Sequence, residues 1–171
     1  DPGAKGVHVL TPEEKKYDFI SSTKFGSFES PVGVAVSKDG KIYVSDSKLG
    51  SVTVFDDDFD ADAVIRDSLE RPTGLCVDPR SGILYVADPA RHRIVTFRSD
   101  GGFAGAFGSR GNRLGEFNFP VSIASGDSFS VVDALNYRIQ RLGPSFTTGM
   151  SFGSQGNAIG RFAAPKSVAL D

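Results

Sequence analysis

Short runs of alternating apolar and polar residues recur along this chain, and clusters of glycine, aspartate, serine and proline separate them. Alternation with a period of two is typical of β-strands, because successive side chains point to opposite faces of a sheet. The 3.6-residue periodicity of an amphipathic helix is absent from the sequence. The pattern therefore predicts an all-β protein with short strands and frequent turns.

The strand pattern repeats at intervals of about 45 residues. Each copy opens with a proline, continues through a small apolar run, and reaches a second run that ends in aspartate. The repeated prolines and aspartates, which we interpret as structural positions, are Pro31, Pro72, Pro120 and Pro165, and Asp46, Asp88 and Asp133. Four short strands in a unit of this length predict the antiparallel blade of a β-propeller.

The repeat predicts that the chain, residues 1–171, is a partial propeller with three full blades and flanking partial blades. Its predicted parts are the outer half of a blade (1–22), three blades (31–67, 72–107 and 120–152) and the inner strand of a further blade (165–171). Closed propellers need about four to eight blades, so this array leaves unpaired sheet edges at both ends. We expect further chain or another subunit to complete the ring.

The linkers between blades also repeat. Residues 107–117 match residues 152–162 at a constant offset of 45, with phenylalanine at both ends of each segment. The glycines of these linkers favour turns with positive φ. The paired phenylalanines are suited to fill the gap between blades, which accounts for a composition of 14 Phe and no Trp.

The turn after the second strand carries a family resemblance. It contains Arg91-His-Arg-Ile in the second full blade and Asn136-Tyr-Arg-Ile in the third, each after a strand that ends in aspartate. Together with the phenylalanine- and glycine-rich linkers, these motifs resemble the NHL-repeat family. The first full blade departs from the motif, with Lys48-Leu49-Gly50 at this turn. The resemblance implies a ring of six blades in most members.

Composition narrows the classes of function. With 39% hydrophobic and 23% charged residues, the chain has enough apolar material for a core. Its net charge of −2 argues against a general attraction to nucleic acid or anionic lipid. No segment approaches the roughly 20 apolar residues of a membrane span, so membrane insertion is not expected.

Residues that commonly carry chemistry are scarce, and we predict no catalytic residue, metal site or cofactor. The single cysteine, Cys76, lies in an apolar inner strand and is interpreted as a buried, inert thiol. His8 and His92 fall in different blades and are too few for a three-histidine zinc site. The acidic run Asp56–Asp62 lacks the glycine and the glutamate of a calcium loop, so a solvated hairpin is favoured.

The repeated aspartates invite a catalytic or metal-binding interpretation, since carboxylates are common in propeller channels. Their recurrence at one position in every blade favours an architectural role instead. We expect the carboxylates of Asp46, Asp88 and Asp133 to accept backbone N–H hydrogen bonds from the turn that follows each strand.

Antiparallel topology places the turns between second and third strands, together with the linkers, on one face of the array. Acidic residues predominate on the opposite face, and basic residues on this one. The residues predicted to bind a partner here are Lys48, Arg91, His92, Arg110, Arg113, Tyr137, Arg138 and Arg161. The alternative interpretation is that these loops are simply solvated.

The function expected from these features is a non-catalytic scaffold that binds a protein or peptide, with an acidic or extended partner favoured. Two alternatives stay open. Members of the family it resembles include propellers that bind single-stranded RNA, although the acidic pI counts against that here. Related propellers also include metal-dependent lyases and lactonases, which need an axial metal site that these blades do not supply. The resemblance favours a bacterial protein in the periplasm or outside the cell over a cytoplasmic one.

Overall fold

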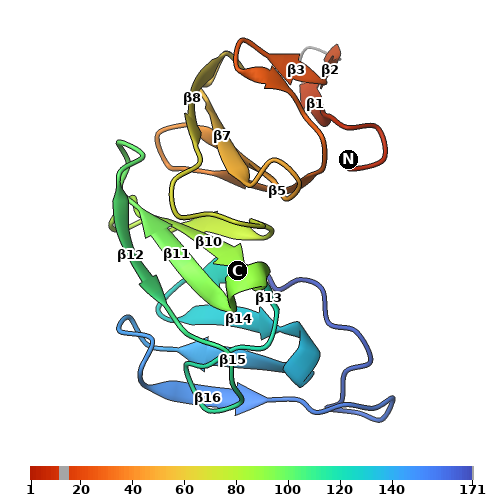
Figure 1. The fold of residues 1–171 in the computed structure, drawn as a ribbon, viewed down its shortest axis with the longest axis vertical. Coiled ribbons are helices and arrows are strands. Elements are labelled where there is room, and N and C mark those ends of the chain that lie inside the picture. Colours follow the sequence, from red (N-terminus) through yellow and green to blue (C-terminus); the bar gives the residue numbers. More distant parts are fainter. Residues whose placement is uncertain (12–15, 171) are drawn as a thin grey trace.

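A computed structural model gives the fold of the chain and describes residues 1–11 and 16–170. The described part contains three sheets of four antiparallel strands and two sheets of two strands (Figure 1). Two short 3₁₀ turns are also present, η1 (Pro89–Arg91) and η2 (Ala134–Asn136). The predicted all-β class with four-stranded antiparallel sheets is confirmed.

The strands follow one another in each sheet in the order of the sequence. The two small sheets are β1 (Val7–Thr11) with β2 (Lys16–Ile20), and β3 (Ser22–Thr23) with β4 (Gly26–Ser27). The first four-stranded sheet holds β5 (Pro31–Val36), β6 (Ile42–Asp46), β7 (Ser51–Phe55) and β8 (Ala61–Ile65). The second holds β9 (Leu75–Val77), β10 (Leu84–Asp88), β11 (Arg93–Phe97) and β12 (Phe103–Phe107). The third holds β13 (Pro120–Ser125), β14 (Phe129–Asp133), β15 (Arg138–Leu142) and β16 (Gly149–Phe152).

The three four-stranded sheets are arranged as successive propeller blades (Figure 1). Their first strands are neighbours, since β9 contacts both β5 and β13. Their last strands, β8, β12 and β16, lie at the opposite side of the array. This order, from an inner first strand to an outer fourth strand, is that of an up-and-down blade.

Apolar side chains fill the spaces between blades. Tyr43 of the first blade and Leu75 of the second belong to one buried cluster, and Tyr85 and Phe129 belong to the next. Phe117 of the linker is fully buried in this second cluster. A linker phenylalanine therefore fills a gap between blades, as the linker sequence predicts.

The residue just before β9 lies so close to the first strand of the third blade that only glycine fits there. The Gly74 N–H donates to the Val121 carbonyl oxygen at 2.9 Å, which joins the second blade to the third. A Cβ atom on Gly74 would lie 2.6 Å from Ser122 Cα and 2.7 Å from the Val121 oxygen. Both contacts are with backbone atoms, so a side chain here would push the two blades apart.

One face of β5 is exposed. Val32, Val34 and Val36 alternate along the strand and expose 45%, 61% and 63% of their surface. The repeat equivalents of Val34 are Leu75 and Ile123, and these expose only 6% and 3% because the preceding blade covers them. The row of valines is thus apolar surface of the kind that a neighbouring blade buries. Completion of the ring by further chain or another subunit stays a prediction.

The predicted inner strand at residues 165–171 is not formed in its described part, residues 165–170. This segment runs beside the third blade, where the Val168 N–H donates to Ser122 Oγ at 3.3 Å. An inner strand is held by a ladder of hydrogen bonds to the second strand of its own blade. No described residue supplies that second strand, so the segment stays outside any sheet.

Candidate interaction face

The turns between second and third strands lie against the linkers that precede their blades. We call this surface the linker face; its turns are 47–50, 89–92 and 134–137, and its linkers are 21–30, 66–74, 108–119 and 153–164. In each full blade a polar contact joins turn to linker. These contacts are Lys48 Nζ with Glu29 Oε2, Arg91 Nε with Glu70 Oε2, and Asn136 Nδ2 with the Gly111 oxygen, each 2.8 Å long.

Asp46 is fully buried at the centre of the first turn, and its carboxylate forms no salt bridge within the described part of the chain. Its oxygens accept N–H bonds of 2.8 to 3.0 Å from Glu29 and Ser30 in the linker. They also accept bonds of 3.0 Å from Lys48 and Leu49 in the turn. Four backbone donors replace the water that this carboxylate loses on burial. The carboxylate thereby fastens the linker to the blade.

Asp133 is also fully buried, but it uses other donors. It accepts the Asn118 N–H at 2.6 Å, and Arg138 Nε pairs with it at 2.8 Å. The predicted bonds from the following turn are not made, because the Ala134 and Leu135 N–H groups already donate to linker carbonyls.

The predicted turn bonds are absent at Asp88 as well. Its carboxylate accepts the Arg71 N–H at 2.9 Å, and Arg93 Nε lies 3.5 Å away. Ala90 and Arg91, the repeat equivalents of the donors Lys48 and Leu49, make no backbone bond to it among the described residues. An architectural role for the repeated aspartates agrees with these contacts, but their donors lie mainly in the linkers.

The fourth turn residue has a left-handed backbone in all three blades. The φ angles of Gly50, His92 and Tyr137 are 62°, 53° and 52°. The Lys48-Leu49-Gly50 turn therefore departs from the family motif in sequence while keeping its backbone, which glycine adopts most readily. His92 is half-buried, and its Nδ1 accepts the Phe119 N–H at 3.2 Å. This hydrogen bond connects the turn of the second blade to the linker that precedes the third blade.

Two of the predicted partner-binding cations are already paired. Glu29 contacts Lys48 at 2.8 Å and Lys5 at 3.4 Å, and Glu70 contacts Arg91 at 2.8 Å. The hydrogen bond and the charge of Lys48 lower the pKa of Glu29, and Glu29 in turn raises the pKa of Lys48. Sequence reasoning missed these pairs, although both glutamates stand two residues before a repeat proline.

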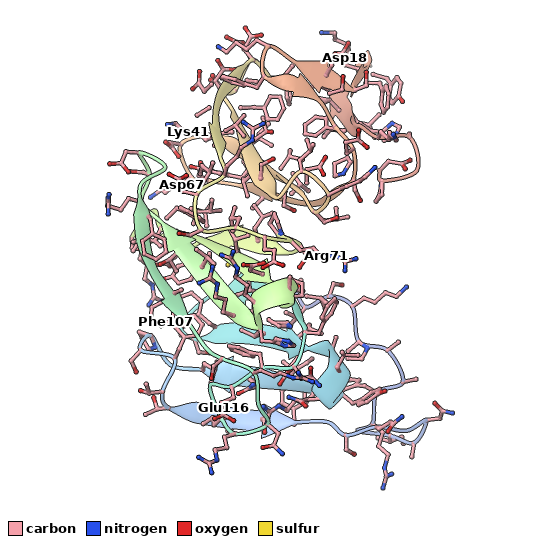
Figure 2. The ribbon with its side chains drawn as sticks, in the orientation of Figure 1. Asp18, Lys41, Asp67, Arg71, Phe107 and Glu116 are labelled. Carbon is pink, nitrogen blue, oxygen red and sulfur yellow. The ribbon has the colours of Figure 1, made fainter. Side chains whose placement is uncertain are left out.

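Arg138, which we predicted to contact a partner, is instead committed to the fold. Its side chain is only 12% exposed. Besides pairing with Asp133, it donates to the carbonyl oxygens of Asn112, Arg113 and Glu116 at 2.7 to 3.0 Å. The linker after β12 crosses the front of the third blade, with Glu116 on it (Figure 2). Arg138 holds that linker in place and has little surface left for a partner.

The remaining predicted cations are exposed. Among the described residues, the guanidinium groups of Arg110 and Arg113 have no hydrogen-bond or ion-pair partner. Arg161 makes one long contact, 3.5 Å from its Nη1 to the Gln155 oxygen. Tyr137 is half-buried. Of the eight residues predicted to bind a partner, these three arginines have the greatest freedom to do so.

Cys76 is held as a neutral thiol. Burial raises its pKa to about 12. At pH 8 only about one molecule in ten thousand then carries the reactive thiolate. We expect iodoacetamide at this pH to leave the native protein unmodified and to alkylate it within minutes in concentrated guanidinium chloride, as followed by intact mass. Alkylation of native and denatured protein at similar rates would contradict the protonated state of the native thiol.

The opposite face forms no group of three or more metal-ligating side chains among residues 1–11 and 16–170. In the acidic hairpin, Asp56 Oδ1 accepts the N–H groups of Asp58 and Asp60 at 3.1 and 2.8 Å. These bonds close a turn within the hairpin. The first carboxylate of the hairpin therefore holds its turn closed.

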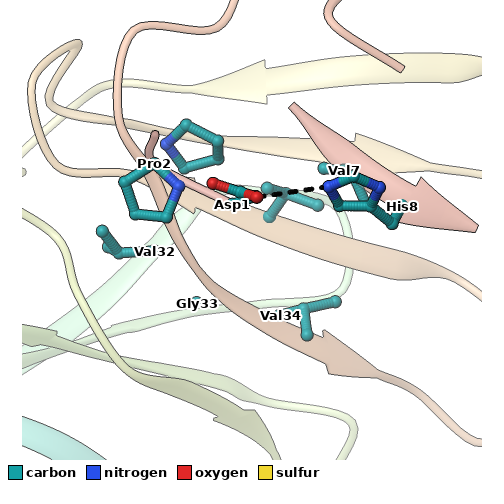
Figure 3. Close-up of a pocket in the computed structure, with 9 residues that line it drawn as sticks. Asp1, Pro2, Val7, His8, Val32, Gly33 and Val34 are labelled. Carbon is teal, nitrogen blue, oxygen red and sulfur yellow. Dashed lines mark hydrogen bonds and ion pairs between the residues drawn. The ribbon is translucent and has the colours of Figure 1, made fainter. Parts of the chain in front are cut away.

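A cavity of about 270 Å³ lies between the N-terminal segment and β5 (Figure 3). Val7, Val32 and Val34 form apolar walls, and Asp1 with His8 forms a polar corner where Oδ2 and Nε2 are 3.4 Å apart. The other ring nitrogen of His8 lies 2.7 Å from the Tyr17 hydroxyl. None of the sequence-predicted partner-binding residues lines this cavity.

Comparison with known proteins identifies the repeat. The model of the NHL repeat matches residues 28–55 and 69–97, which contain the buried Asp46 and Asp88 with their linker donors. These two segments are NHL repeats. The matched NHL segments run from the end of a linker to the third strand of its blade, so they include the contacts that fasten linker to turn.

Curated relatives match this NHL-repeat chain over part of their length. The human E3 ubiquitin-protein ligase NHLRC1 is 34% identical over 65 residues, 38% of this chain and 16% of that protein. The peptidylglycine alpha-amidating monooxygenase of Rattus norvegicus is 26% identical over 151 residues, 77% of this chain and 16% of that protein. The chain thus spans about a sixth of the length of each of these relatives.

Among solved structures, the virginiamycin B lyase from Staphylococcus aureus is similar with a TM-score of 0.72 and 16% identity. The match covers 97% of the NHL-repeat chain and 53% of the lyase chain. At this identity the likeness concerns the fold. No helix among the described residues has the length and apolar character needed to cross a membrane.

Proposed function

We propose that this NHL-repeat propeller is a non-catalytic module that binds a protein partner on its linker face. The observation that carries the proposal is the contrast among its cations. Lys48 and Arg91 are neutralised by glutamates, whereas Arg110, Arg113 and Arg161 project from the linkers without ion pairs among the described residues. A free guanidinium can bind a carboxylate in bidentate geometry without first breaking an internal pair.

The contacts of the repeated aspartates also support a scaffold. Asp46, Asp88 and Asp133 are fully buried and accept hydrogen bonds from linker N–H groups. A general acid or base must reach a proton on its substrate. Carboxylates that are fully buried in this way have no such reach, and the Cys76 thiol stays protonated near neutral pH. Binding therefore accounts for the described side chains better than catalysis does.

Charge reversal of the free arginines tests the proposal. We expect the triple variant Arg110→Glu, Arg113→Glu, Arg161→Glu to capture its partner at least about tenfold less well than the unchanged protein, a loss of about 1.4 kcal/mol or more in binding free energy. Capture is measured by cross-linking on the immobilised protein and quantitative mass spectrometry of the bound proteins.

The matched control carries the same change in charge on the opposite face, as Lys38→Glu, Arg80→Glu, Arg98→Glu. We expect this control to capture the partner as well as the unchanged protein does. Equal capture by both triple variants would reject the linker face as the binding surface. Binding of a labelled oligouridine with a steep salt dependence would favour the RNA-binding alternative instead.

A further inference from the structure

We infer that the linker face of the third blade binds an extended acidic segment that also carries bulky apolar side chains. This inference rests on the proposed function. The site consists of the turn 134–137 and the two long linkers on either side of it, 108–119 and 153–164. We call it the third-blade site. Three independent features of these segments define the partner: their continuity, their exposed apolar side chains and their charge.

The three segments form one continuous surface. The Asn136 side-chain amide donates to the Gly111 oxygen at 2.8 Å, and the Leu135 N–H donates to the Asn118 oxygen at 3.0 Å. On the other side, a Cβ atom built on Gly153 would lie 3.0 Å from the Tyr137 oxygen. The turn is therefore in contact with both linkers, and a partner that crosses the turn meets all three segments.

Apolar side chains are exposed on the first linker and on the turn. Leu114 exposes 37% of its surface, and Leu135 exposes 53%. Neither side chain belongs to a buried cluster of the described residues. Leucine side chains left in water beside arginine offer apolar surface whose burial against a partner supplies affinity.

The charge of the site is positive. The two linkers contain Arg110, Arg113 and Arg161 against one carboxylate, Glu116, which leaves an excess of two positive charges. Glu116 is turned inward, where its Oε2 accepts the Arg113 N–H at 3.0 Å. A partner with carboxylates complements this surface. Because its most exposed side chains are aliphatic, the site favours a peptide over single-stranded RNA, which stacks its bases on aromatic rings.

Blade geometry sets the spacing of the partner's residues. Sheets that pack face to face are about 10 Å apart, and an extended chain advances about 3.3 Å per residue. Equivalent positions on neighbouring blades are therefore bridged by about three to four residues. We expect carboxylates at that spacing in the partner, with a large apolar residue between them.

Selection from a displayed library of random peptides of about twelve residues tests the inference. We expect the enriched peptides to carry two or more Asp or Glu residues three to four positions apart, with Leu, Ile, Phe or Met between them. Affinities are then measured by fluorescence polarisation with a synthetic copy of the most enriched peptide. The charge variant R110Q/R113Q/R161Q and the apolar variant L114S/L135S should each bind it about tenfold more weakly or worse.

The control variant K38Q/R80Q/R98Q should bind the same peptide as tightly as the unchanged protein, and thermal unfolding checks that all variants are folded. Peptides that need the linker face but lack the acidic and apolar pattern would overturn this inference and leave the proposed function standing. Peptide binding that none of the linker-face variants weakens would overturn both. Displacement of the peptide by oligouridine at low micromolar concentration would also overturn the inference, in favour of RNA.

Discussion

Replacement of Asp133 by alanine should lower the free energy of unfolding by about 3 to 5 kcal/mol. The substitution leaves Arg138, whose side chain is 12% exposed, without its counter-charge, and it leaves the Asn118 N–H without an acceptor. A buried unpaired cation is among the most destabilising changes in a folded protein. Urea unfolding measures the change in free energy. Far-UV circular dichroism is the signal, because the chain contains no Trp for fluorescence.

An exposed ion pair provides the matched control. Asp100 lies 3.6 Å from Arg98, and both side chains are more than half exposed. Asp100→Ala should therefore change stability by less than about 1 kcal/mol. Equal effects of Asp133→Ala and Asp100→Ala would show that the buried carboxylate does not fasten the linker as described.

The second large effect is expected at Gly74. Gly74→Val places a branched side chain where a Cβ atom alone would lie 2.6 Å from Ser122 Cα. The chain just before β9 must move away from β13 to admit it, and the bond from Gly74 N–H to the Val121 oxygen is lost. Overpacking against backbone costs about 3 kcal/mol or more, since no rotamer change relieves it. Thermal unfolding should show a lowered Tm.

Gly105 offers the comparison for this prediction. It lies in β12, and a Cβ atom there would be 3.6 Å from Thr96 Oγ1, an ordinary van der Waals contact. Gly105→Ala should thus leave Tm nearly unchanged. If Gly74→Val unfolds at the same temperature as Gly105→Ala, the blades are not packed backbone to backbone at this point.

The architecture could be inferred from the sequence because it depends on local pattern. Alternation in the strands, the repeat prolines and the aspartate at the end of each second strand are all visible without coordinates. The same holds for Phe117, since a phenylalanine that recurs in glycine-rich linkers has few places to be buried. Each of these features follows from the periodicity of strands or from the restricted space between blades.

The candidate site was less predictable, because it depends on which segments fold over which side chains. Arg138 resembles a surface arginine in sequence, yet the linker that crosses it buries the side chain and supplies its acceptors. Lys48 and Arg91 form ion pairs with glutamates some 20 residues away in the chain. Pairing over such a distance follows from the path of the linker, which alternation and motif spacing do not specify.

The contact between linker and buried aspartate bears on how propellers of this kind change in size. The donors at Glu29 and Ser30 and the acceptor at Asp46 fall within a single matched repeat, residues 28–55. A gene duplication or deletion that begins just ahead of the proline copies or removes donors and acceptor together. Blade number can thus evolve by whole units in which the aspartate keeps its own linker donors.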